Sequence, residues 1–141
     1  LFQKEVPLYT LSTLLSFTIP FLRPGSTVHG VIDARRQHLY IESVKMKSDE
    51  SVETTGPRVV VLPEVVKLLN SGDVVVGTGW ERLDMDQRDQ IRWNGTNAIS
   101  AKNLVLGWNH HSIKHKYKKE DPRSFEPNYI TVSQINNTPA K

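Results

Sequence analysis

The sequence of 141 residues predicts a mainly β protein, either an antiparallel β-sandwich or a partly open barrel, with one short helix. Seven or eight short segments alternate apolar with polar residues or are rich in β-branched residues, and most of them are separated by Pro, Gly or Asn. Only the segment 63–71 has the apolar spacing and end signals of a helix. The length suits a single domain, which we expect to span residues 1–135 before a frayed tail, 136–141.

The first predicted strands form a meander. Phe17, Ile19 and Phe21 alternate with Thr and Pro, as in a half-buried edge strand, although the leucines before them also fit a helical stripe. A Pro-Gly turn then leads into a predicted strand at 27–34, and a second turn leads into another at 39–47. Together these segments predict three antiparallel strands.

The middle of the chain contains the one predicted helix. Residues 48–57 are polar and predict a surface loop, and residues 58–62 are β-branched and predict a short strand. A proline at the start and a glycine after the end bound the helix at 63–71. A buried strand is predicted at 73–80, followed at 81–90 by a charged loop or one or two helical turns.

The last predicted strands begin with a hairpin. Asn94-Gly95 supplies the positive φ angles of a two-residue turn, with strand-forming residues on both sides. Leu104, Leu106 and Trp108 alternate along the next predicted strand, and residues 129–135 form the last. This succession of short strands resembles a jelly roll.

Charge is unevenly distributed along the chain. The net charge is +3, but residues 101–141 contain seven basic and three acidic side chains. The absence of cysteine excludes disulfides and thiolate metal sites, and no signal peptide or membrane-spanning stretch is present. We therefore expect an intracellular or virion location. Because the chain begins at a leucine, we also expect it to be part of a larger polypeptide, with a viral one as a candidate source.

A basic segment at 108–119 is the best indication of a partner. It contains four lysines, three histidines and two aromatic residues without a carboxylate. Lysines neutralise phosphates, and aromatic rings stack on unpaired bases. The sequence predicts binding of nucleic acid or another polyanion, with Arg35 and Arg36 as further basic candidates; the residues of the segment in this site are Trp108, Lys114, Lys116, Tyr117, Lys118 and Lys119. Alternatively, Trp108 belongs to the core and the lysines promote solubility.

Metal binding has little support. His110, His111 and His115 have a spacing that can bring two imidazoles to one ion, but no cysteine is near and the neighbouring lysines oppose a cation. Residues 81–92 interleave acidic side chains with arginines, which indicates surface ion pairs. We therefore predict no metal site and no cofactor.

No catalytic signature is apparent. The chain has no phosphate-binding glycine loop and no Gly-x-Ser-x-Gly elbow, although His29 and Asp33 share a strand face. The spacing of Glu42 and Lys45 places them on opposite faces of a strand, which opposes a metal-dependent nuclease. The sequence thus predicts no catalytic residue.

The segment 30–36, Gly-Val-Ile-Asp-Ala-Arg-Arg, resembles motifs of two protein families. It is similar to the Gly-Val-Ile-Asp motif of dUTPases, which implies a jelly-roll trimer with Asp33 in the active site, although the Gly-Arg-Ser-Ser phosphate motif is absent. It also resembles the strand aspartate of plant-virus movement proteins, in which a later glycine, here Gly95, completes the pattern.

Three functions follow from these observations. The first is a non-enzymatic domain that acts in assembly and binds nucleic acid or another polyanion. The second is a protein–protein or capsid-type module, such as a homo-oligomer, in which the basic segment has no role. The third is a dUTPase-like enzyme centred on Asp33.

Overall fold

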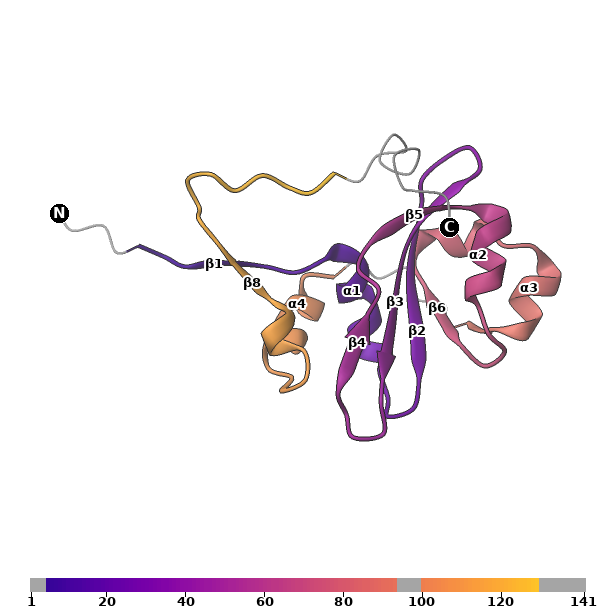
Figure 1. Ribbon diagram of the computed structural model, residues 1–141, viewed down its shortest axis with the longest axis horizontal. Coiled ribbons are helices and arrows are strands. Elements are labelled where there is room, and N and C mark those ends of the chain that lie inside the picture. Colours follow the sequence, from indigo (N-terminus) through magenta and orange to yellow (C-terminus); the bar gives the residue numbers. More distant parts are fainter. Residues whose placement is uncertain (1–4, 94–99, 130–141) are drawn as a thin grey trace.

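The computed structural model describes residues 5–93 and 100–129 and has a mixed α/β fold. Its central sheet has the strand order β4-β3-β2-β6-β7, and β5 also pairs with β3. Helices cover both faces of this sheet (Figure 1). Within the described ranges there is no closed barrel and no second large sheet to complete a sandwich. The predicted antiparallel, jelly-roll-like architecture is therefore wrong.

The antiparallel half of the sheet is built on a long hairpin. β2 (Thr27–Asp33) and β3 (His38–Met46) pair along their whole lengths. β5 (Arg58–Val61) pairs with the first half of β3, and β4 (Val52–Thr54) pairs with its end. The strands predicted at 27–34, 39–47 and 58–62 are thus confirmed, whereas β4 lies within the predicted loop.

The other half of the sheet is parallel. The predicted helix is confirmed as α2 (Leu62–Leu68), which connects β5 to β6 (Val74–Val76), and β6 runs parallel to β2. The 3-10 helix η2 (Thr78–Arg82) and α3 (Met85–Gln90) lead to β7 (Arg92–Trp93), parallel to β6. Parallel neighbours need such crossover connections. The strand predicted at 73–80 is consequently shorter than expected.

Two predicted strands are helices. The segment 17–21 belongs to α1 (Thr13–Thr18) and the 3-10 helix η1 (Ile19–Phe21), and 104–108 belongs to α4 (Lys102–Trp108). In α1, every residue after the first is buried, so the helix has no polar face that would reveal its period. Its start signal is Ser12, whose hydroxyl oxygen accepts a bond from the Leu15 backbone nitrogen at 3.4 Å.

Three predictions fall on residues that the structure does not describe. These residues are 94–99 and 130–141. The Asn94-Gly95 turn and its second strand lie there, as do nearly all of the predicted strand 129–135 and the tail. Of the predicted hairpin, only the first strand is described, as β7. The segment 81–90 contains α3, as in the helical alternative.

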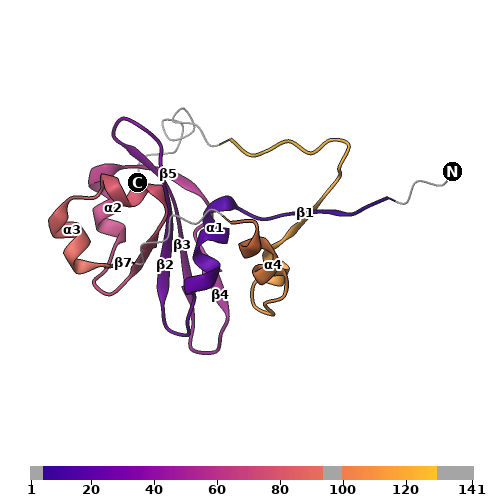
Figure 2. The same ribbon diagram turned by 180° about the vertical axis from the view of Figure 1, so that it is seen from behind.

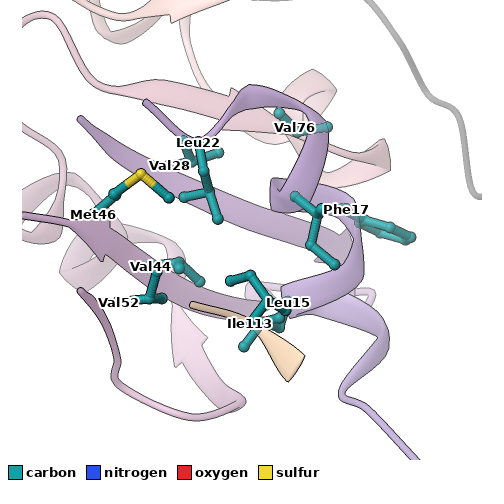
Figure 3. Close-up of a cluster of buried hydrophobic side chains, with 10 residues drawn as sticks. Leu15, Phe17, Leu22, Val28, Val44, Met46, Val52, Val76 and Ile113 are labelled. Carbon is teal, nitrogen blue, oxygen red and sulfur yellow. The ribbon is translucent and has the colours of Figure 1, made fainter. Parts of the chain in front are cut away.

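Each face of the sheet contributes to its own hydrophobic cluster. Alternate residues of β2 and β3 point to opposite faces. The α1 side, shown in Figure 3, is formed by Leu15, Phe17, Ile19, Leu22, Val28, Val44, Met46, Val52, Val76 and Ile113. The α2 side is formed by Val31, Leu39, Ile41, Val65, Val75, Trp80, Leu83 and Ile91.

An outer layer lies beyond α1. α4 packs against α1 and η1 rather than against the sheet (Figures 1 and 2). β1 (Leu8–Thr10) pairs antiparallel with β8 (Lys118–Glu120), and this two-stranded ribbon extends away from the central sheet. Two segments far apart in the sequence are thus brought together beside α4. None of the helices in the described part of the chain is long and apolar enough to cross a bilayer.

Candidate nucleic-acid interface

The basic segment runs from the end of α4 to β8. After Trp108 the chain turns, forms the 3-10 helix η3 (Lys114–Lys116) and enters β8. Ile113, in the middle, is 0% exposed and belongs to the cluster under α1. The segment is therefore attached to the domain core by Ile113, with Tyr117 packed against the same cluster, while Lys114, Lys118 and Lys119 are exposed.

Trp108 is the centre of an aromatic group. Its ring centroid lies 4.7 Å from that of Tyr9 and 5.3 Å from that of Tyr117, with the Tyr117 ring edge-on at 88°. The ammonium of Lys114 lies 5.0 Å from the Trp108 ring centroid, within cation–π range. The stacking surface of Trp108 thus lies beside the positive charge of Lys114. Trp108 lies outside both core clusters.

Tyr117 connects the ribbon to the helix. Its hydroxyl donates a hydrogen bond to the Leu104 carbonyl oxygen of α4. Burial raises the pKa of the Tyr117 phenol above its usual value, which further disfavours loss of the proton that makes this bond. The ring is thereby held edge-on to Trp108.

The aromatic group forms one wall of an apolar groove. The groove has a volume of about 530 Å³ and is lined by Tyr9, Thr10, Leu11, Leu104, Val105, Trp108, Tyr117 and Phe125. Tyr9 and Leu11 come from the N-terminal part of the chain and Phe125 from the other end. Sequence reasoning missed these three residues, because nothing local indicates that segments about a hundred residues apart meet.

The lysines of the segment differ in exposure. Lys114, Lys118 and Lys119 are exposed, whereas Lys116 is half-buried. Lys118 lies 3.5 Å from the Glu120 carboxylate. The pKa of Glu53 is held below its usual value first by its bond from Lys47 and, to a smaller extent, by the charge of Lys116. The segment has no carboxylate in its sequence, but acidic side chains surround it in space.

Arg35 and Arg36 lie far from these lysines. They form the β2–β3 turn, with φ angles of 67° and 52°. His111 of the basic segment lies 3.3 Å from Glu50, in the turn at the other end of β3. Since β3 has nine residues, the two turns are separated by roughly 25–30 Å. The two arginines and the lysines therefore do not form one groove.

Asp33 has a structural role at the same turn. Its carboxylate accepts a bond from the Arg35 backbone nitrogen at 2.8 Å and pairs with the Arg82 guanidinium at 2.7 Å. The jelly roll that the dUTPase resemblance implies is not the fold of the described residues. The fold of the described residues therefore does not support a dUTPase active site at Asp33.

The histidines and Glu42 are also satisfied locally. His110 and His111 stack at 5.0 Å, and among the described residues no three His, Asp or Glu side chains are placed to share a metal ion. Glu42 is buried and accepts bonds from the Ser12 hydroxyl and, at 2.6 Å, from the Thr54 hydroxyl. Its carboxylate therefore connects α1 and β4 to β3.

A buried polar chain lies on the other face of the sheet. His29 on β2 is opposite Ser43 on β3, and its Nδ1 lies 2.7 Å from the Ser43 hydroxyl oxygen. Its Nε2 lies 2.7 Å from Asp73 Oδ2. Sequence reasoning placed His29 beside Asp33; the structure pairs it with Asp73, because β6 lies parallel to β2.

No protein-family model matches the chain, and no curated protein is significantly similar to it in sequence. The function of this chain is therefore inferred from its own residues.

Proposed function

We propose that this domain binds single-stranded nucleic acid through the surface formed by α4, η3 and β8. The observation that carries the proposal is the position of the Lys114 ammonium above the Trp108 ring, beside a groove lined with aromatic side chains. A lysine at the ring contacts a phosphate while the groove accepts an unpaired base. The same cations attract other polyanions, but only a nucleic acid uses both features.

The expected affinity divides into two parts. Stacking of a base on an aromatic ring contributes about 1–3 kcal/mol and depends little on sequence. Each phosphate contact adds roughly 0.7 to the slope of log affinity against log salt for a single strand. Lys114, Lys118 and Lys119 are exposed and available for such contacts. Binding is therefore expected to be weakly sequence-selective and strongly salt-dependent.

A salt titration with a short single-stranded oligonucleotide tests the proposal. Replacing Lys114, Lys118 and Lys119 with alanine is expected to reduce the salt slope by up to about 2, because three phosphate contacts are lost. Trp108→Ala is expected to weaken binding at every salt concentration by about tenfold or more, because stacking is lost.

The matched control replaces Arg35 and Arg36 with alanine, which removes two positive charges at the distant β2–β3 turn. This variant is expected to bind like the original chain. Absence of binding at low salt, or an equal loss in the control, would exclude the proposed surface.

Self-association is a second candidate, supported by the exposed side of α4. Leu104, Val105 and Leu106 are 42%, 62% and 52% exposed. Consecutive exposed apolar side chains beside an apolar groove are typical of contact surfaces. In this alternative α4 contacts a second copy of the chain, and the basic segment takes no part.

Val105→Glu tests this alternative, because it places a charge in the middle of the exposed apolar stretch. The original chain is expected to show the mass of an oligomer by light scattering, and Val105→Glu is expected to show that of a monomer. Val66→Glu on α2, at a valine that is also exposed, is the control and should leave the mass unchanged. A monomeric original chain excludes the alternative.

A further inference from the structure

The Ser43–His29–Asp73 chain has the connectivity of an activated nucleophile. His29 is 1% exposed, and its two ring nitrogens lie 2.7 Å from Ser43 Oγ and from Asp73 Oδ2. The Asn70 backbone nitrogen donates to the same Asp73 oxygen at 3.0 Å. A hydroxyl bonded to an imidazole, with the imidazole oriented by a held carboxylate, is the arrangement that activates serine nucleophiles.

The positions of Ser43 and Asp73 favour one neutral tautomer of His29 over the other. An ionised carboxylate only accepts hydrogen bonds, so Nε2 carries the hydrogen and donates it to Asp73. Nδ1 then has a free lone pair and accepts from the Ser43 hydroxyl. The imidazole is therefore set to take the Ser43 proton, with the two nitrogens exchanged relative to the usual serine hydrolase triad.

Ser43 is more exposed to solvent than His29 and Asp73, as a reaction at its hydroxyl requires. His29 and Asp73 are buried, whereas Ser43 is only half-buried. The opposite face of the sheet provides a contrast: Glu42, the preceding residue, is enclosed between two hydroxyl donors. Ser43 thus joins the buried His29 imidazole to the molecular surface.

We propose that Ser43 is a reactive serine that is acylated by small, unhindered carboxylic esters. Ser43 Oγ bonds to the ester carbonyl carbon, and its proton passes to His29 Nδ1. The bond from that carbon to the leaving oxygen breaks, and the leaving alcohol takes the proton from His29. Water then attacks the acyl group, gives a proton to His29 and releases the acid, and Ser43 regains its proton.

The amide of Ser43 does not assist this reaction. It donates to the Thr55 hydroxyl at 3.1 Å, so it is not free to stabilise the oxygen of the tetrahedral intermediate. The tetrahedral intermediate forms in both steps, so we expect acylation to be faster than at an ordinary serine but slower than in a serine hydrolase, and turnover to be slow. This activity is independent of nucleic-acid binding, because its residues lie on the opposite face of the sheet from α4.

The test is acylation of the full chain by p-nitrophenyl acetate, followed by peptide mass analysis. One acetyl group is expected at Ser43, with release of p-nitrophenol about a hundredfold faster than from Ser43→Ala. Ser51→Ala is the matched control, since Ser51 bonds to the Asp49 carboxylate at 2.6 Å without an imidazole. It should react like the original chain.

Asp73→Asn tests the positioning role of the carboxylate. With the carboxylate lost, His29 no longer acts as the base, so the rate should become proportional to hydroxide, as for an unassisted serine. The melting temperature, measured in parallel, distinguishes loss of reactivity from loss of fold. If Ser43 is not acetylated, or if Ser43→Ala reacts as fast as the original chain, the proposal fails whatever the result with oligonucleotides.

Discussion

Replacing Gly77 with alanine is expected to lower the free energy of unfolding by about 3 kcal/mol or more. Gly77 directly follows β6 and has a φ angle of 121°, a conformation that residues with a side chain rarely adopt. A Cβ atom at this position would lie 2.1 Å from the Val31 carbonyl oxygen of β2. The backbone of the central sheet would have to move, and urea unfolding measures the loss.

Gly25→Ala is the matched control for this prediction. Gly25 also has a positive φ, 82°, but a Cβ atom there would have no neighbour within 4 Å. Only the conformational cost remains, about 1–2 kcal/mol. Equal destabilisation of the two variants would show that close packing against Val31 contributes nothing.

Ile113→Ala is expected to destabilise the protein by about 2–4 kcal/mol and to weaken nucleic-acid binding as well. Ile113 is fully buried under α1, although the two residues that follow it, Lys114 and His115, are exposed. Its removal leaves a cavity and loosens the attachment of the basic segment. Lys114 would then lose its fixed position above Trp108, which the proposed interface requires.

The two effects of Ile113→Ala are measured separately. Urea unfolding gives the stability, and the oligonucleotide titration at low temperature gives the affinity of the folded fraction. Ile113→Val, which removes one methylene, should cost about 1 kcal/mol and leave the affinity unchanged. A destabilised Ile113→Ala variant with full affinity would mean that the segment is positioned by other contacts.

Sequence reasoning succeeded where the controlling interactions are local. The β2–β3 hairpin was predicted because alternation and a short turn act within neighbouring residues. α2 was predicted because proline and glycine bound it and its apolar side is clear. Only α2 has one buried and one more exposed side; the hairpin is buried on both faces, and its short turn and strand-forming residues identify it.

The same reasoning failed for α1 and α4. α1 is buried almost all round, so its pattern is compatible with a strand or a helix. In α4 the residues Leu104, Val105 and Leu106 are exposed rather than packed, so apolarity there does not report burial. With these two segments assigned as strands and β6 taken as one more antiparallel neighbour, a sandwich seemed to follow.

Some residues of the candidate sites could be predicted from the sequence, and others could not. The positive charge and aromatic content of the basic segment are visible in the sequence, since they depend on composition alone. The inclusion of Arg35 and Arg36 was not supported, because a nine-residue strand separates their turn from the lysines. The contact of Tyr9 with Trp108 and the pairing of His29 with Asp73 depend on long-range strand pairing, which no local pattern specifies.

By itself, the sequence determined the local elements of the hairpin, the helix α2 and the sign of the charge near the C-terminus. These properties depend on residue preferences and spacing over a few positions. Only the tertiary structure decided that the sheet is mixed, that α1 and α4 are helices, and that Ser43, His29 and Asp73 meet. Such features arise when segments distant in the chain bury apolar surface together, and that choice is made by packing rather than by local pattern.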